Sequence, residues 1–294
     1  MCVFFVRLKI KSVKRFSGCM VDRHLVINYS VTAISFVLSA SAHAASWQAT
    51  VNEEPPGNFP APPLIEARYH IGWAGLTAAT AETYFSKPLA ERFQLEGTGR
   101  TVGLARILWR YDVNYRSVAN ATTLRPIESN QTETYRSKKI QTHLVFTNAG
   151  VRRTRNETPG PGTSKTREFN FPNLFDLLSS LLYLRSQPLK DGSVYRVVVY
   201  PATSAYLATF TVTGREKISV HAGTYNAIKL DLRLHKVGND LELEPHKKFR
   251  RASVWVSDDT TRIPLRAEAQ IFIGTVFAEL QSVHFRSEKY ERAP

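Results

Sequence analysis

Apolar and polar residues alternate with a period of two in one segment of this chain after another, and this alternation limits the fold more than any other feature. In residues 65–73, Ile65 and Tyr69 share one face while Glu66 and Arg68 lie on the other. A half-buried strand has this pattern because successive side chains point to opposite faces. The same pattern recurs in residues 140–146, 206–212, 228–234, 263–273 and 276–280. Short turn segments separate most of these runs, which predicts antiparallel strands joined as a meander.

One segment has helical periodicity instead. Its leucines recur at Leu174, Leu177, Leu178, Leu181 and Leu182. This spacing predicts one amphipathic helix near residues 173–186, with Asn173 as N-cap, Asp176 in the first turn and Pro188 ending it. A weaker helical pattern covers residues 103–110. We therefore expect an all-β fold, mainly an antiparallel meander forming a curved sheet or open barrel, with the helix covering an open face or plugging one end.

The first 44 residues have the three parts of a secretory signal peptide. Lys and Arg residues precede a largely apolar run at residues 25–38, and small residues then lead to an A-x-A motif that ends at Ala44. We expect cleavage between Ala44 and Ala45, with Met20 as an alternative start that gives the same mature protein. The apolar run is shorter than the ~20 residues that span a bilayer, so a membrane anchor or buried helix is the less favoured alternative. The pattern predicts a soluble periplasmic protein without a transmembrane span.

Removal of this leader changes the composition. Both cysteines, Cys2 and Cys19, would be lost, and a chain without thiols has no disulfide, no thiolate metal site and no cysteine nucleophile. The formal net charge would fall from +14 to about +9. Basic residues are spread widely, with local concentrations in residues 152–167 and 247–251. Such diffuse charge in an exported protein indicates anionic envelope polymers or lipid head groups rather than nucleic acid.

Prolines mark the boundary between the leader and the predicted folded region. Residues 45–63 contain five prolines, which disfavour helix and sheet pairing, so we expect an extended Pro-rich linker. A single β domain is expected over residues 64–287, followed by a C-terminal tail at residues 288–294. Within the domain, residues 147–170 are rich in Gly, Pro and basic residues, which predicts a mobile basic loop or hairpin tip.

The sequence lacks the local motifs of common enzyme classes. It has no G-x-S-x-G nucleophile elbow, H-E-x-x-H zinc helix or Walker phosphate loop. Its histidines are scattered singly, so we expect no metal site, and we assign no cofactor and no catalytic residue. Asp258 and Asp259 form an adjacent carboxylate pair that acid–base chemistry could use. Their position between two strands favours turn hydrogen bonds and pairing with Arg262 instead, and an enzymatic role stays open.

Five short stretches occur in a characteristic order, at residues 69–76, 176–185, 222–227, 255–265 and 273–280. Together they resemble the bacterial exported family called domain of unknown function 3108, over roughly residues 64–286. The resemblance implies an exported, mainly β protein, and it implies no known activity or catalytic residue. The glycines of these stretches suit turns or close backbone approach, and the two tryptophans suit the core. The candidate structural motif residues are Trp73, Gly75, Asp176, Arg185, Gly223, Trp255, Asp258, Asp259, Arg262 and Gly274.

Two classes of function fit these observations. An apolar face that recurs from strand to strand, with one helix to cover it, is typical of β proteins that hold lipids or acyl chains. Our first hypothesis is therefore a non-enzymatic binder or carrier of an apolar envelope ligand, although a simple packed core would give the same pattern. Our second is an envelope structural or interaction protein whose basic segments dock on an anionic polymer or a protein partner. An enzyme is less favoured, and the sequence does not indicate the oligomeric state.

Overall fold

A single antiparallel sheet organises this protein. The computed structural model describes residues 46–58, 60–73, 75–160, 162–245, 251–271 and 274–286. The predicted signal peptide, its cleavage site at Ala44 and Ala45, the alternative start Met20, the tail at residues 288–294 and the basic residues at 247–250 lie outside the described residues. Residues 51–294 form one unit and residues 2–50 another. In the latter, the described part is η1 (Trp47–Thr50), a single 3-10 turn in which Thr50 Oγ1 donates to the Trp47 carbonyl at 2.7 Å.

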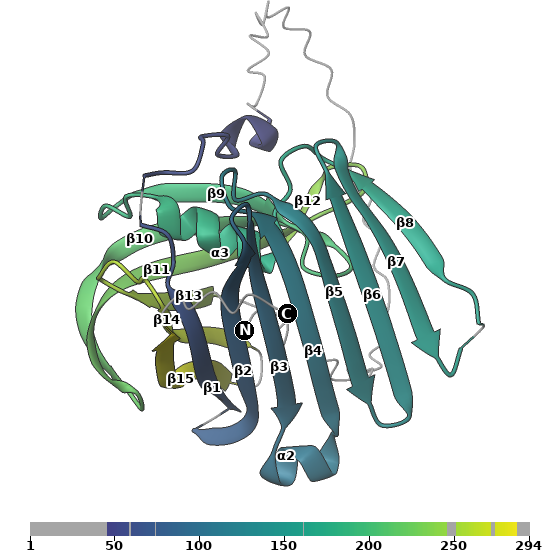
Figure 1. Cartoon of the computed structure of the whole chain (residues 1–294), viewed down its shortest axis with the longest axis horizontal. Helices are drawn as coiled ribbons and strands as arrows, with labels where there is room; N and C mark the ends of the chain where they lie inside the picture. Colours follow the sequence, from purple (N-terminus) through teal and green to yellow (C-terminus); the bar gives the residue numbers. More distant parts are fainter. Residues whose placement is uncertain are drawn as a thin grey trace, which may run out of the picture. The chain divides into compact units, whose positions relative to one another are not determined.

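The first half of the sheet is a meander in which each strand pairs with the next one along the chain. Every one of these pairings is antiparallel, and Figure 1 shows the strands side by side in chain order. A short helix, α2 (Gly103–Leu108), connects the third strand to the fourth. The strands are β1 (Leu64–Trp73), β2 (Leu76–Leu89), β3 (Arg92–Thr101), β4 (Tyr111–Asn120), β5 (Pro126–Tyr135), β6 (Lys138–Thr147), β7 (Gly150–Thr158) and β8 (Lys165–Asn170).

The second half is also antiparallel and joins the first through the last strand, which pairs with β1. The complete order is β8-β7-β6-β5-β4-β3-β2-β1-β15-β14-β13-β11-β10-β9, with β12 attached to β11. The sheet is therefore open, with β8 and β9 as its edges, and the predicted all-β antiparallel fold is confirmed. The strands are β9 (Val194–Val199), β10 (Ala205–Val220), β11 (Gly223–Val237), β12 (Leu243–Pro245), β13 (Arg251–Ser257), β14 (Pro264–Ile271) and β15 (Gly274–Arg286).

The predicted helix is α3 (Leu177–Ser186), which lies between β8 and β9 in the chain. The prediction of Asn173 as its N-cap is wrong. Asp176 is the N-cap, and its carboxylate accepts from the Ser179 amide at 2.8 Å and from the Ser179 hydroxyl at 2.6 Å. Asn173 instead has a φ of 58°, a left-handed turn conformation that asparagine tolerates. The helix ends at Ser186, two residues before Pro188, as residues ahead of proline favour extended backbone.

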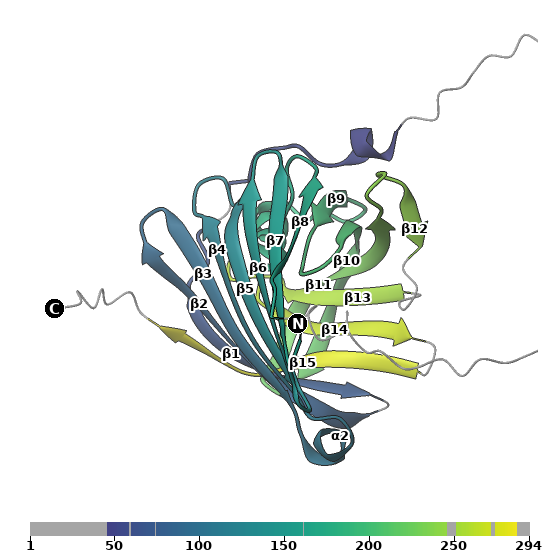
Figure 2. The ribbon, with the colours of Figure 1, turned by 90° about the vertical axis from the view of Figure 1, so that its right-hand side faces the viewer.

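α3 packs against both halves of the sheet, which curl around it (Figures 1 and 2). Leu178 and Leu182 join a cluster with Phe85, Phe93 and Ala119 of β2–β4. On its other side the segment that carries the helix packs against the second half of the sheet. That cluster contains Phe175, Tyr183, Leu184, Leu189, Val197, Phe210, Ile228, Leu230 and Val256. The apolar face of the second half is therefore a packed core.

Side chains and one short backbone contact join the two edges of the open sheet. Phe175 lies beside β9, where its amide donates to the Val198 carbonyl at 2.9 Å and its carbonyl accepts from the Tyr200 amide at 2.7 Å. From the other edge, the Phe169 ring lies 5.8 Å from the Tyr200 ring, and Arg153 donates to the Thr203 carbonyl at 2.8 Å. We call the gap between the edge strands β8 and β9 the seam. These contacts bridge the seam, although the two strands do not pair with each other.

The proline-rich segment that precedes β1 contacts this same region. Asn52 pairs with Arg196 of β9 through its amide, at 2.8 Å, and through its side-chain oxygen, at 2.5 Å. The Gly57 amide donates to Ser186 Oγ at 3.0 Å, and the Pro60 carbonyl accepts from Arg185 at 2.5 Å. These contacts place the segment along β9 and the C-terminal end of α3.

Candidate functional site

The inner face of the sheet, defined as the face that meets α3, is polar over part of its first half. Ala119 of β4 belongs to the cluster around Leu178 and Leu182, and alternation then puts Ser117 and Tyr115 on the same face. The pairing register carries this face across β5, β6 and β7 in two rows. We call these residues the inner rows: Tyr115, Gln131, Thr142 and Arg155 in the first, and Ser117, Ser129, Leu144 and Arg153 in the second.

Buried polar groups are concentrated in the inner rows. Gln131 is 6% exposed and Arg153 is 7% exposed. Three buried atoms there have no hydrogen-bond partner: Oε1 of Gln131, Nε of Arg153 and Nε of Arg155. A buried polar group without a partner costs about 1–3 kcal/mol. Three polar atoms on this face thus have unused hydrogen-bonding capacity.

The two arginines differ in how firmly they are held. Arg153 Nη1 donates to the Thr203 carbonyl at 2.8 Å and lies 3.5 Å from the Tyr200 hydroxyl, so its head spans the seam. Arg155 Nη2 lies 3.7 Å from a Glu157 oxygen, and its side chain is 28% exposed. Arg155 is therefore less constrained by the sheet than Arg153.

The N-cap of α3 connects the helix to the inner rows. Asp176 is fully buried, and its Oδ2 accepts from the Tyr115 hydroxyl at 3.1 Å and from the Ser117 hydroxyl. Burial raises the pKa of the Asp176 carboxyl, although the hydrogen bonds from Ser117, Ser179 and Tyr115 oppose this shift. Burial, followed by the charge of Asp176, also raises the pKa of the Tyr115 phenol. Both shifts follow from desolvation of the charged form.

A second buried carboxylate lies on β5. Glu133 is 2% exposed, and the Tyr111 hydroxyl of β4 donates to its Oε1 at 2.8 Å. It belongs to the same face as Gln131, two residues away on the strand. The inner face of β4–β7 therefore carries buried carboxyl and guanidinium groups.

Arg185 and Arg262 hold α3 against the turn between β13 and β14 by a reciprocal exchange. Arg185 donates to the Thr261 carbonyl at 3.0 Å and to the Thr260 carbonyl at 2.7 Å. From the turn, Arg262 donates to the Arg185 carbonyl at 2.7 Å, and it also bonds the carbonyls of Gln187 and Pro188. The Arg185 guanidinium thus binds carbonyls of the β13–β14 turn, and the Arg262 guanidinium binds carbonyls that the C-terminal end of α3 leaves unpaired. Together the two side chains tie the helix to the turn.

Asp258 and Asp259 lie in the turn between β13 and β14, where both make polar contacts. Asp259 Oδ1 accepts from the Ser257 hydroxyl at 2.9 Å, the Thr261 amide at 2.8 Å and the Arg262 amide at 3.0 Å. Asp258 Oδ2 accepts from Arg215 Nε at 3.0 Å, and the charge of Asp258 also acts on the nearby Arg262 guanidinium. The Arg262 guanidinium donates hydrogen bonds to carbonyls at the C-terminal end of α3.

The motif glycines and tryptophans fall at turns and strand ends. Gly75, Gly223 and Gly274 have φ values of 83°, 133° and 121°, a region that residues with a Cβ rarely adopt. Trp255 is 7% exposed and donates to Glu216 at 2.5 Å. The expectation that Trp73 lies in the core is wrong, because it is 43% exposed at the end of β1. It lies beside Gly274, where an added Cβ would be 3.4 Å from the Trp73 Nε1 atom.

The predicted basic loop is a hairpin of β7 and β8, and the strand pattern divides its charges. Arg152 faces outward, with its side chain 67% exposed, and pairs with Glu168 at 2.8 Å. Arg153 points inward and is buried, so Arg153 does not belong to the exposed basic surface that the docking hypothesis requires of this segment. Strand alternation causes this division.

Three further observations concern binding sites and membrane spans. A depression of about 320 Å³ on β2–β4 has a largely polar lining, composed of Thr80, Glu82, Thr98, Gly99, Arg100, Asp112, Val113 and Asn114. Among the described residues, no group of three or more His, Cys, Asp or Glu side chains is placed to hold a metal ion. None of the described helices is long and apolar enough to cross a membrane.

The chain is similar to several solved structures, and the one with a TM-score of 0.55 supports the fold. A β-barrel-like protein of domain of unknown function DUF1849 from Brucella abortus is 8% identical, with a TM-score of 0.55, covering 77% of this chain and 99% of its own. A candidate lipoprotein from Parabacteroides distasonis is 9% identical, with a TM-score of 0.33, covering 79% of this chain and 100% of its own. No curated protein matches the sequence. The family model of proteins of unknown function DUF3108 matches residues 68–281. This match spans more than half of the chain, which therefore belongs to the DUF3108 family.

Proposed function

We propose that this protein is exported and binds, without chemically transforming it, an amphipathic lipid-like molecule whose anionic head group lies against the inner rows. The unpaired buried atoms of Gln131, Arg153 and Arg155 support this best. A guanidinium N–H without a partner is suited to a carboxylate or phosphate oxygen, because charge-assisted hydrogen bonds are the stronger ones. The signal-peptide pattern of residues 1–44 supports export.

Hydrocarbon could lie next to such a head group. On the same face, Ile140 and Leu144 of β6 are each 1% exposed, and Val151 of β7 is 4% exposed. Val151 and Arg153 lie two residues apart on β7, so an aliphatic side chain and a cation are neighbours on this face. We therefore propose the first half of the sheet for the ligand, because the apolar face of the second half is packed against the segment that carries α3.

Docking on an anionic polymer through the basic segments has weaker support. Arg152 is paired with Glu168 at 2.8 Å, and Arg251 with Asp231 at 3.0 Å. Cations that already have acidic neighbours attract a polyanion less strongly. We therefore favour the lipid-like ligand.

Native mass spectrometry with lipid extraction tests the proposal on the full chain, purified after expression in a bacterial host. We expect an anionic amphiphile bound to the wild type and a reduced bound fraction in Arg155→Gln. Arg152→Gln is the matched control, since it removes the same charge from the outer face of the same strand. No bound amphiphile in the wild type, or equal loss in both variants, would contradict the proposal.

A further inference from the structure

α2 exposes more aliphatic surface than a stable protein surface normally carries at one place. Leu104, Ile107 and Leu108 are 77%, 81% and 76% exposed, and nearby Leu76 is 70% exposed. We call these four residues the apolar tip. Single exposed aliphatic residues are ordinary, but a contiguous group indicates a contact surface.

All four lie at one end of the sheet. Ala79 of β2 pairs with Thr101 of β3, so the start of β2, with Leu76, lies at the same end as α2, which follows β3. The Val102 amide donates to the Ala78 carbonyl at 2.9 Å and fixes this arrangement. Figures 1 and 2 both show α2 at the extreme end of the strands.

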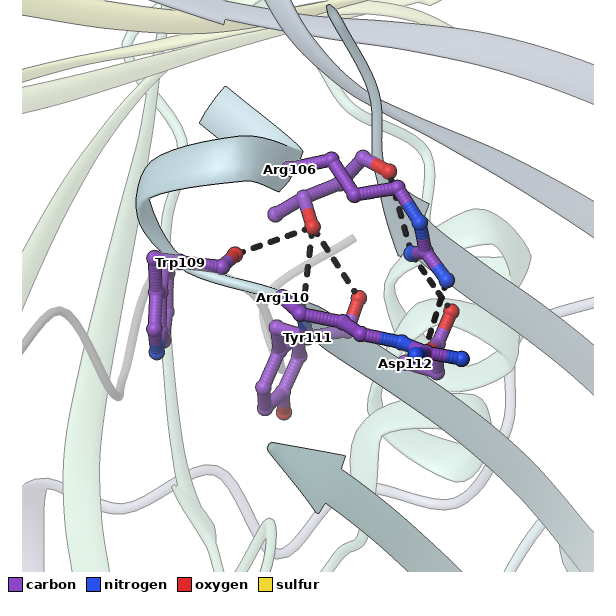
Figure 3. A network of polar contacts seen from close by, with 6 residues as sticks. Arg106, Trp109, Arg110, Tyr111 and Asp112 are labelled. Carbon is purple, nitrogen blue, oxygen red and sulfur yellow. Dashed lines mark hydrogen bonds and ion pairs between the residues drawn. The ribbon is translucent and has the colours of Figure 1, made fainter. Parts of the chain in front are cut away.

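Polar contacts hold α2 in place (Figure 3). Arg106 pairs with Asp112 at 2.9 Å and also donates to the Thr101 carbonyl at 3.3 Å. Thr101 Oγ1 donates to the Trp109 carbonyl at 3.0 Å and accepts from the Tyr111 amide at 3.1 Å. The exposure of the apolar tip therefore belongs to a fixed structure and not to a loosely attached loop.

Three exposed cations lie at the same end of the sheet as the apolar tip. Arg110, directly after α2, has a side chain that is 68% exposed and lies 3.9 Å from Asp112. The turn between β5 and β6 lies at the same end, because the Arg136 amide donates to the Arg110 carbonyl at 3.3 Å. That turn carries exposed Arg136 and, at the start of β6, exposed Lys139. Aliphatic residues with Lys and Arg beside them match the depth profile of an anionic bilayer.

We propose that the apolar tip docks on the surface of an anionic phospholipid bilayer. Leu104, Ile107 and Leu108 enter the interfacial layer, while Arg110, Arg136 and Lys139 contact lipid phosphates. The inference is independent of the ligand proposed for the inner rows, since it concerns the outside of one end of the sheet.

Vesicle co-sedimentation of the full chain tests it, with the N-terminus of the purified protein established by intact mass. We expect binding to mixed phosphatidylglycerol–phosphatidylethanolamine vesicles that weakens with added salt, and much weaker binding to phosphatidylcholine. Changing Leu104, Ile107 and Leu108 together to Ser should lower the partition coefficient by about a hundredfold or more. Changing Arg110, Arg136 and Lys139 to Gln should lower it about fivefold per charge on anionic vesicles.

The control variant carries Leu89→Ser and Val145→Ser, which remove exposed aliphatic side chains elsewhere, 55% and 40% exposed. It should bind vesicles as the wild type does, and thermal unfolding should show that all variants are folded. Arg155→Gln should also bind vesicles normally, which separates this proposal from the inner-row ligand. Wild-type protein that does not bind anionic vesicles, a triple Ser variant that binds equally well, or self-association that this variant abolishes would overturn the proposal.

Discussion

Replacement of Asp176 should destabilise the fold more than the loss of an ordinary helix cap, because this carboxylate also joins α3 to β4. Its oxygens accept from Ser179, Tyr115 and Ser117. Loss of an N-cap costs about 0.5–2 kcal/mol, and each buried hydroxyl left without an acceptor costs about 1–3 kcal/mol. Because the two hydroxyls can partly re-pair, we expect Asp176→Ala to lower the free energy of unfolding by about 3–5 kcal/mol.

Urea unfolding followed by circular dichroism measures this change. Asp191→Ala is the matched control: its carboxylate pairs with Arg215 but is 59% exposed, so we expect a change of about 1 kcal/mol or less. Asp176→Asn keeps one acceptor oxygen and should be intermediate. Equal midpoints for Asp176→Ala and Asp191→Ala would refute the assigned role of Asp176.

The pH dependence of the same experiment has a definite sign. The pKa of Asp176 is raised in the folded state, so its neutral form is favoured by folding. The stability of the wild type relative to Asp176→Asn should therefore be greatest below the unfolded pKa of about 3.9 and should fall as pH rises through the folded pKa. A difference that grows with pH would contradict the buried, hydrogen-bonded carboxyl described here.

Three further predictions concern other parts of the fold. Arg185→Ala and Arg262→Ala should each lower the free energy of unfolding by about 1.5–3 kcal/mol. A double-mutant cycle should be non-additive, because the two side chains hold one contact between α3 and the β13–β14 turn. Additive changes in the free energy of unfolding would argue against this shared contact. Gly72→Ala should lower the free energy of unfolding by about 1–3 kcal/mol in urea unfolding, because an added Cβ would clash with the Phe277 ring. Gly97→Ala is the control without this steric cost, since the atom nearest to an added Cβ there is 3.7 Å away. Burial raises the pKa of the Tyr69 and Tyr115 phenols, so neither should ionise before the protein unfolds at alkaline pH. The phenolate absorbance of the folded protein should therefore be the same in wild type, Tyr69→Phe and Tyr115→Phe. A smaller absorbance in either variant would contradict the burial of that tyrosine.

The strands whose inner face is apolar could be predicted from the sequence. The strands whose inner face is polar could not. β1, β10, β11 and β14 contain the alternating runs that indicated them. In β3, β4 and β5 the inward residues include Gly97, Ser117 and Gln131, so the period-two contrast disappears although the pairing is regular. Alternation of apolar and polar residues reveals a strand only when one face of the strand is apolar.

The helix was predictable, but its N-cap was assigned to the wrong residue. Asn173 and Asp176 are both good N-cap residues. Ser179, three residues after Asp176, completes a local capping box with it, and Tyr115 and Ser117 of β4 add hydrogen bonds that the local sequence does not show. The inner rows were missed for a related reason: Arg153 could be distinguished from Arg152 only after residues 150–158 were known to form a strand.

Equilibrium binding of matched amphiphiles tests the proposed function most directly. Delipidated full chain is titrated by calorimetry with a long-chain fatty acid and with the fatty alcohol of equal length, both below their critical micelle concentrations. The account predicts that the anionic ligand binds at least about tenfold more tightly, since hydrogen bonds to charged groups are worth about 1.5–3 kcal/mol. Arg155→Gln should lose this preference and Arg152→Gln should keep it. Equal affinity for acid and alcohol in the wild type, or no binding of either, would contradict the account.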